Sequence, residues 1–300
     1  MNRKKAGSKE KWMTAGLLLL LIAALLLPGC GKTEETDLGV SLTEEQEEQT
    51  LTIKGDTLST DLQYTLKDLA VLSDVGFEHL YSTINNWPSA QIYAAKGIRV
   101  KKILEEAGVL DTAEVITFRS GDSYEASFTK EQLFGPTFYY PGVAEGSEEG
   151  AEAVEPILAL QYKENSEKIE DAIPQDPCLI VGQRNPLEHS NPAFVENISE
   201  IIVSAKAPEK WEAPSTFPLP GKIAKGETVK LQHPSIGIVK LHYTIDGSDP
   251  TEGSPMYNPS TYQPELNVPI TITEDMTIKV LVCGYGKENS DIATFRFDAQ

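Results

Sequence analysis

The amino-terminal segment decides which part of this chain can belong to the folded protein. Five basic residues within the first eleven positions precede an apolar run over residues 15–27. These 13 residues fall short of the ~20 that a membrane-spanning helix needs, and no basic cluster follows them. The pattern is that of a signal peptide over residues 1–29. It predicts that the rest of the chain is exported and folds outside the cytoplasmic membrane.

The apolar run ends at Leu27-Pro28-Gly29-Cys30. This sequence resembles the lipobox of bacterial lipoproteins, with Pro28 in place of the more usual alanine or serine. The resemblance implies that Cys30 becomes the lipidated N-terminus, and two acyl chains give stable anchoring. We therefore expect a lipid-anchored protein at the outer face of the cytoplasmic membrane or on the cell surface. An ordinary secretory signal with an incidental cysteine is the alternative, and it would leave a soluble exoprotein.

Composition divides the remaining 271 residues into three parts. Residues 30–48 are rich in glutamate and poor in apolar residues, which predicts an acidic, solvated tether. The length that follows is enough for two domains of ordinary size. A segment with four prolines over residues 207–220 predicts a stiff connector at their boundary. The expected domains are 49–207 and 208–300.

The exported part of the chain is strongly acidic. The leader carries five of the 26 basic residues and one of the 45 acidic ones, so the remainder has a net charge of −23. Such a chain repels nucleic acid and anionic lipid surfaces, and we expect no nucleic-acid partner. The expected partners are the membrane, through the N-terminal lipid, and an unidentified small ligand or surface protein.

Short strands and a few helices alternate in the first domain. Capping boxes at Thr65 and Thr129 predict two short helices, and apolar residues at helical spacing predict a third over residues 99–107. Strand patterns occur at 51–55, 63–66, 115–119, 123–128, 157–162, 178–182 and 198–203. This mixture predicts an α+β domain.

The second domain contains strand patterns and no helical periodicity. The patterns occur at 227–232, 238–245, 269–272, 276–282 and 292–297. They predict an Ig-like β-sandwich. Asp246 and Asp249 have the spacing of turn residues, and a calcium site is the alternative. Cys178 and Cys283 fall in apolar strand patterns of different domains, so we expect buried thiols and no disulfide.

Several segments of the first domain resemble the molybdopterin-binding fold of the sulfite oxidase family. They are residues 81–87, 93–108, 116–124, 155–160 and 191–203. In catalytic members of that family a cysteine in the first of these segments binds molybdenum, whereas this chain has Thr83 there. A hydroxyl is a poor substitute for a soft thiolate. No twin arginine precedes the apolar run, so we expect export as an unfolded chain, which cannot carry a preassembled cofactor. We therefore expect no cofactor, and molybdopterin is implied by the resemblance alone.

The same resemblance places a cleft in the first domain. Thr83, Asn85, Asn86 and Trp87 would line it, with Tyr81, Arg119, Asp122 and Tyr124 as neighbours. Aromatic, amide and hydroxyl groups in a cleft can orient a small polar ligand. The alternative is that Trp87 and Tyr124 are core aromatics and that Asn85-Asn86 forms a turn.

The second domain resembles the C-terminal β-sandwich module of chitobiases and many bacterial surface proteins. The matching segments are 242–251, 276–282 and 289–297, together with Tyr257. The module carries no catalytic residues in that family, so the resemblance implies a spacer or an interaction surface. It also suggests an association with carbohydrate.

Motifs for catalysis are missing from the sequence. There is no nucleotide-binding glycine loop, no H-E-x-x-H and no G-x-S-x-G, and the four histidines lack ligand spacing. We therefore predict no catalytic or metal-binding residue and favour a lipid-anchored, non-catalytic protein that binds a ligand or partner. One alternative is a molybdopterin-dependent oxidoreductase with an altered metal ligand. The other is a cell-wall carbohydrate-associated protein.

Overall fold

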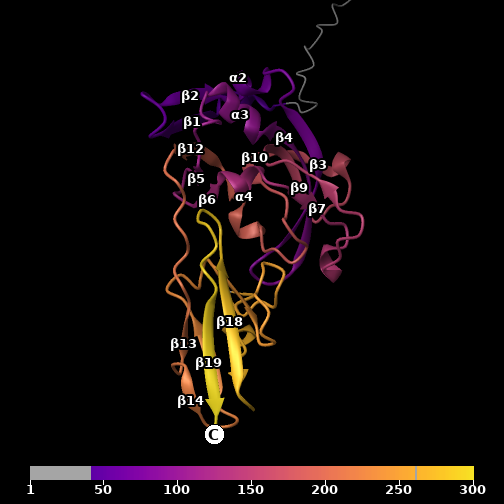
Figure 1. Cartoon of the computed structure of the whole chain (residues 1–300). Coiled ribbons are helices and arrows are strands. Elements are labelled where there is room, and N and C mark those ends of the chain that lie inside the picture. The colour runs from indigo at the N-terminus through magenta and orange to yellow at the C-terminus, as the bar shows by residue number, and fades with distance from the viewer. Residues whose placement is uncertain (1–41, 261) are drawn as a thin grey trace, which may run out of the picture. The chain divides into compact units, whose positions relative to one another are not determined.

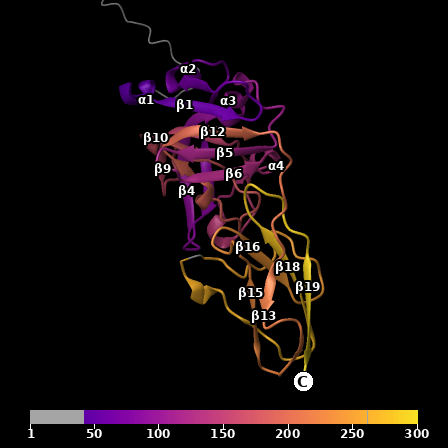
Figure 2. The same cartoon turned by 90° about the vertical axis from the view of Figure 1, so that its left-hand side faces the viewer.

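Two five-stranded sheets make up the part of the structure that precedes the proline-rich connector (Figure 1). The computed structural model describes residues 42–260 and 262–300. The predicted signal peptide, the lipidation site Cys30 and the tether up to residue 41 lie outside the described residues. Sheet A contains, in spatial order, β2 (Leu62–Thr65), β1 (Thr50–Gly55), β12 (Ile198–Ser204), β5 (Val115–Ser120) and β6 (Glu125–Thr129). Figure 2 shows β1, β12, β5 and β6 following one another across this sheet.

Sheet B is antiparallel throughout its described pairs. In spatial order it contains β11 (Val195–Glu196), β10 (Ile173–Ile180), β9 (Ile157–Glu164), β4 (Ala90–Arg99) and β3 (Gly76–Ile84). In sheet A the β1–β12 pair is parallel. A further short pair joins β7 (Phe138–Tyr139) to β8 (Glu152–Ala153).

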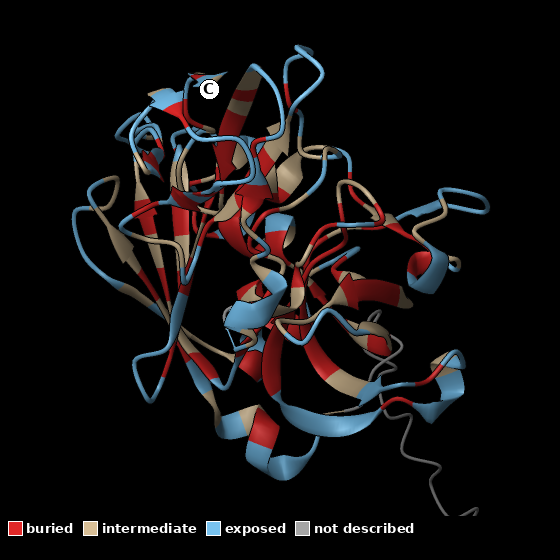
Figure 3. Ribbon diagram, turned by 90° about the horizontal axis from the view of Figure 1, so that it is seen from below, coloured by how far each residue is buried: buried red, intermediate tan, exposed pale blue. Residues whose placement is uncertain are grey.

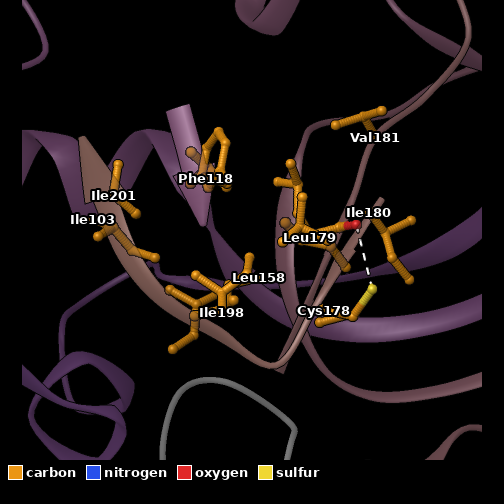
Figure 4. Close-up of a cluster of buried hydrophobic side chains, with 14 of the residues drawn as sticks. Ile103, Phe118, Leu158, Cys178, Leu179, Ile180, Val181, Ile198 and Ile201 are labelled. Atoms are coloured by element: carbon orange, nitrogen blue, oxygen red, sulfur yellow. Dashed lines mark hydrogen bonds between the residues drawn. The ribbon is translucent and has the colours of Figure 1, made fainter. Parts of the chain in front are cut away.

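One apolar core joins the two sheets. Phe118 of β5 and Ile201 of β12 lie in the same cluster as Leu158 of β9 and Leu179 of β10 (Figure 4). In β5 the buried residues alternate with partly exposed ones, as expected of a strand with one face on a core. Buried residues concentrate in the strands and the connecting loops are largely exposed (Figure 3).

The described residues include four short α-helices: α1 (Glu44–Glu48), α2 (Leu66–Ala70), α3 (Val100–Glu106) and α4 (Lys130–Phe134). The predicted capping boxes at Thr65 and Thr129 are confirmed, because each threonine hydroxyl accepts a hydrogen bond from the third helical N–H and the reciprocal bond is also made. The third predicted helix is confirmed as α3. Gly108 follows it with φ +68°, in the left-handed region that favours glycine.

Helix α1 falls within the segment that we expected to be a solvated tether. Its Gln46 is buried, and the side-chain amide donates hydrogen bonds of 2.8 Å to the carbonyls of Leu160 and Gln175. Residues 44–48 therefore belong to the folded body, and the prediction of a tether up to residue 48 extends too far.

The prediction of an α+β first domain is wrong, because the structure is mostly β-sheet and belongs to the all-β, sandwich-like class. Each α-helix has only five to seven residues. A capping box marks where a helix begins but does not set its length. The hairpin of β3 and β4, the longest strands of the two sheets, was not predicted, since both strands contain consecutive buried residues that erase the two-residue alternation.

The C-terminal part is a β-sandwich, as predicted. One sheet contains β13 (Ser215–Phe217), β15 (Thr228–Gln232) and β17 (Ile270–Thr271); the other contains β14 (Gly221–Ile223), β19 (Ala293–Ala299), β18 (Met276–Cys283) and β16 (Lys240–Thr244). Its own core includes Val229, Leu241, Val280 and Phe297. The five predicted strands are confirmed as β15 to β19. β13 and β14 were not predicted, because the first lies within the proline-rich segment and both are only three residues long.

The turn after β18, residues 284–287, packs against helix α4 and strand β6 (Figure 1). We call it the interface turn. The Gln132 side chain donates to the carbonyls of Gly284 and Lys287 and accepts from the N–H of Gly286, each at 2.9 Å. Gly286 has φ +82°, and a Cβ there would lie 2.8 Å from Cβ of Ser127. The described residues thus belong to one compact unit, in which the sandwich is bonded to the first part.

Candidate functional site

Two turns position five of the eight residues that we expected at a cleft. In the turn between β3 and β4, the Asn85 side chain accepts hydrogen bonds from the N–H groups of Trp87 (2.9 Å) and Ser89 (3.1 Å). In the turn between β5 and β6, the Asp122 carboxylate accepts from the Tyr124 N–H (3.1 Å) and from the Ser120 hydroxyl. Asparagine and aspartate favour such turns because their short side chains bond to nearby backbone.

These turns border a cavity of about 510 Å³, which we call the acidic pocket. Asn85, Asn86, Trp87, Asp122 and Tyr124 line it. Two further carboxylates, of Glu164 and Glu196, also line it, and its described lining contains no lysine or arginine. The acidic pocket therefore suits a neutral or cationic group and repels an anion.

The three other expected residues do not line this pocket. Tyr81 is fully buried and donates a hydrogen bond of 2.6 Å to the Glu155 carbonyl. Thr83 is also fully buried, and its hydroxyl oxygen accepts a bond of 2.7 Å from Ser190. Arg119 projects from sheet A and pairs with Glu125 at 2.8 Å and Glu200 at 3.2 Å. The expectation that these three residues border the cleft is wrong, because Tyr81 and Thr83 are enclosed by the rest of the protein and Arg119 is held by its two carboxylate partners.

The residues at this site do not fit a molybdenum cofactor held by a protein thiolate. Thr83 offers no thiol, and its hydroxyl is buried against Ser190. Cys178 lines the acidic pocket, but burial raises the pKa of its thiol and nearby Glu196 raises it further. The thiol points to the carbonyl of Leu179 at 3.4 Å (Figure 4). A protonated thiol is not a metal ligand.

Three aromatic side chains stand at the mouth of the acidic pocket. Trp87 is 57% exposed, Tyr124 49% and Tyr262 62%. The interpretation of Trp87 and Tyr124 as core aromatics is therefore wrong, whereas Asn85 does hold a turn. Trp87 stacks on Tyr262 of the sandwich with ring centroids 5.5 Å apart and planes inclined by 15°. We call Trp87, Tyr124 and Tyr262 the aromatic rim.

A second cavity of about 630 Å³ lies where the first part meets the sandwich. We call it the cleft. It shares Asn86, Tyr124, Pro192 and Tyr262 with the acidic pocket, so the two cavities adjoin. The cleft was not predicted, because its lining comes from both domains and each domain was interpreted alone.

A hydrogen-bonded ion network crosses one wall of the cleft. Arg184 pairs with Glu188 at 2.6 Å and with Glu252 of the sandwich at 3.0 Å. Tyr285 of the interface turn donates to Glu188 at 2.7 Å, and Asn289 donates to Glu252 at 2.7 Å. Both carboxylates and the guanidinium are thus satisfied within the protein.

Lys240 also lines the cleft, but it has no carboxylate partner in the described structure. Its ammonium donates to the carbonyls of Asn258 (3.2 Å) and Pro259 (3.4 Å), and it forms no ion pair within residues 42–260 and 262–300. Burial lowers the pKa of this amine to about 8, because the charged form loses solvation.

Two histidines also line the cleft. Nδ1 of His189 is enclosed and has no hydrogen-bond partner in the described structure. Burial is the main reason that the pKa of this imidazole is lowered to about 3, and the neighbouring Lys240 and His242 contribute to the same shift. Nδ1 of His242 lies 2.9 Å from the Ser254 carbonyl, and burial lowers the pKa of this ring as well. Both rings are therefore neutral at pH 7.

The remaining candidates have structural partners. Asp246 accepts from the N–H of Ser248 at 3.0 Å, and Asp249 pairs with Lys279 at 2.6 Å, which confirms the turn interpretation. No group of three or more metal-ligating side chains occurs in the described part of the chain. Cys178 and Cys283 are free and buried, as predicted. Within the same residues, no helix combines the length and apolar character needed to cross a membrane.

Comparison with known proteins identifies the sandwich. The family model described as "Fn3 associated" matches residues 229–297, which supports an Fn3-like β-sandwich there. No curated protein matches the sequence. Among solved structures, the chain is similar to the sulfane dehydrogenase SoxCD from Paracoccus pantotrophus, with 13% identity, 86% of this chain and 77% of that chain covered, and a TM-score of 0.35. It is also similar to Drosophila N-cadherin EC1-3, with 9% identity, coverages of 85% and 69%, and a TM-score of 0.20. Both TM-scores are too low for either match to assign a fold.

Proposed function

We propose that this chain is a lipid-anchored extracytoplasmic protein that binds a small ligand in the cleft between its first part and its Fn3-like sandwich. The observation that carries the proposal is the cleft itself, a cavity of about 630 Å³ with aromatic walls and an unpaired lysine. Ligand sites in proteins are concave and largely apolar, with a few placed polar groups. The cleft has these features.

The anchoring part of the proposal is supported by the sequence. The segment that ends at Cys30 has the form of a lipoprotein leader, and an exported, acidic chain suits a surface location. The sandwich, which we propose to be a module of the chitobiase C-terminal type, then forms one wall of the cleft through Lys240 and Tyr285. Its role would extend beyond that of a spacer.

Binding is favoured over redox catalysis by the position of Thr83. A molybdopterin-dependent oxidoreductase with an altered ligand would need a donor that faces a cavity at this position. Thr83 is fully buried and lines neither the cleft nor the acidic pocket.

Tryptophan emission tests the proposal. Trp87 lines the acidic pocket and Trp211 lines the cleft, and no other tryptophan follows the leader. The full chain in detergent would be titrated with aromatic carboxylates, the matching carboxamides, aromatic amines and neutral oligosaccharides. We expect a saturable change in emission with at least one of these compounds, absent from the Trp211→Phe variant and kept in Trp87→Phe. No change in emission or in melting temperature with any compound would refute the proposal.

A second candidate, binding of cell-wall carbohydrate, is favoured by the aromatic rim. The C–H face of a sugar ring packs on an exposed aromatic ring, and carboxylates and amides accept its hydroxyl protons. The acidic pocket places Trp87 and Tyr262 beside Asn86, Glu164 and Glu196. Sedimentation with insoluble chitin and with peptidoglycan tests this candidate. The full chain should co-sediment and Trp87→Ala should not, whereas failure to bind either polymer would eliminate the candidate.

A further inference from the structure

Most of the charged side chains that line the cleft have a partner of opposite charge. Arg184 pairs with both Glu188 and Glu252, so this network has a net charge of −1, and Glu125 pairs with Arg119 outside the cleft. Among the described lining residues this leaves two lysines, Lys240 and Lys287.

The two lysines differ in their surroundings. Lys287 has a carboxylate partner, Glu209, at 3.2 Å, and its ammonium lies 5.1 Å from the centre of the Trp211 ring. Lys240 contacts only two backbone carbonyls. A half-buried ammonium without a counter-charge is costly, and proteins rarely keep one that has no function. Among the described residues that line the cleft, Lys240 is thus the cation that has no carboxylate partner.

The neutral ring of His189 lies near this charge, since Lys240 contributes to the lowering of its pKa. His189 presents an enclosed Nδ1 that has no partner in the described structure. A neutral imidazole offers one donor and one acceptor, so this nitrogen can bond to a polar atom of a ligand. An enclosed polar atom without a partner carries a desolvation cost that such a bond would remove.

Apolar groups supply the rest of the cleft. Trp211 and Tyr285 lie in its lining with Met256 and with Ile238, which is 72% exposed. Side chains of this kind gain free energy by covering an apolar or aromatic ring. The cleft therefore offers apolar and aromatic surface together with one ammonium group that has no carboxylate partner.

From these features we propose that the cleft takes a monoanionic carboxylate with an apolar or aromatic body, in which Lys240 binds the carboxylate and His189 bonds to a polar atom beside it. This inference rests on the proposed function and adds the ligand class. A single unpaired cation matches a single negative charge. A dianion such as a phosphate monoester would leave one negative charge uncompensated among Glu125, Glu188 and Glu252.

Calorimetric titration with a matched pair of probes tests the ligand class. 2-Naphthoate and 2-naphthamide have the same shape and differ in charge, and each would be titrated into the full chain in detergent. A charge-assisted hydrogen bond contributes more than a neutral one, so the carboxylate should bind about tenfold or more tightly than the amide. Lys240→Met should abolish this preference, and Lys240→Arg should restore most of it. Lys222→Met removes an equal charge from an exposed position on β14 and should change nothing.

Each outcome has a distinct meaning. Equal affinity of the two probes in the wild-type chain, or a carboxylate preference that survives in Lys240→Met, would overturn the ligand class and leave a binding cleft standing. Binding of neither probe, together with unchanged tryptophan emission across the whole panel, would overturn both this inference and the proposed function. If Lys240→Met fails to fold, Lys240→Gln would replace it, and near-UV circular dichroism would confirm the fold of each variant.

Discussion

Replacement of Lys240 by methionine should stabilise the ligand-free protein while it removes carboxylate binding. The pKa of Lys240 is lowered from 10.5 to about 8 by burial, so its charge is costly in the folded state. At about 1.4 kcal/mol per pKa unit, the cost is about 3.5 kcal/mol at pH 7. Methionine fills a similar volume without a charge but loses two hydrogen bonds, to Asn258 and Pro259, of about 1 kcal/mol each. The net expectation is a gain of about 1.5 kcal/mol.

The pH dependence of this gain identifies its cause. Below pH 8 Lys240 is charged in both the folded and unfolded states, so the whole cost of burying the charge acts on the folded wild-type protein. Between pH 8 and 10.5 the folded protein releases the proton that the unfolded chain keeps, and wild-type stability rises with pH. The advantage of Lys240→Met should therefore shrink as the pH rises and reverse above about pH 9.

Urea denaturation of the full chain at pH 7.0, 8.5 and 9.5 measures this dependence, with the exposed Lys222→Met as the control. The control should stay within about 0.5 kcal/mol of the wild-type free energy of unfolding at every pH. A Lys240→Met variant that is less stable than wild type at pH 7, or whose stability difference from wild type does not change with pH, would refute the reasoning. Lys240 would then be a well-solvated or internally paired lysine.

Three further predictions concern other parts of the chain. Gln132→Ala removes three hydrogen bonds to the interface turn and one capping bond, so the free energy of unfolding should fall by about 2–4 kcal/mol. The sandwich and the first part should then unfold in separate calorimetric transitions, and a single transition at the wild-type temperature would contradict this. His189→Gln should reduce the loss of stability at acid pH. The folded protein keeps His189 neutral down to about pH 3, whereas the unfolded chain gains a proton below about pH 6.5, so this residue lowers the free energy of unfolding by about 1.4 kcal/mol per pH unit in that range. If the urea midpoint shifts equally between pH 6 and 4.5 in the wild type and the variant, His189 does not have this role. The wild-type chain should incorporate labelled fatty acid and Cys30→Ser should not; a wild-type chain that takes up no label, or a variant that still does, would show that no lipid is attached at Cys30.

Local features of the sequence were predictable where the determining contacts lie within a few residues. The capping boxes at Thr65 and Thr129 each involve a residue three positions away, so both helix starts were found. The lengths of these helices depend on tertiary packing, and each helix is too short to make the domain α+β. The β3–β4 hairpin was missed because both strands contain runs of consecutive buried residues, which interrupt the alternation on which a strand prediction depends.

The candidate site was predictable only in part, for a related reason. Asn85 and Asp122 shape their turns through neighbours two to four residues away, so the turns at the acidic pocket could be found. The resemblance named Thr83 as a cleft residue, but it did not reveal that the side chain is buried against Ser190, which is 107 positions away. The cleft depends on contacts such as Arg184 to Glu252 that join two domains. No pattern within either domain encodes such a contact.

A crystal structure of the chain with bound 2-naphthoate is the measurement that tests the proposed ligand site most directly. The account predicts electron density in the cleft, with the carboxylate within hydrogen-bond distance of Lys240 Nζ and the rings beside Trp211 and Tyr285. Density for the probe at another place on the protein, with the cleft empty at a concentration that saturates binding in solution, would contradict it.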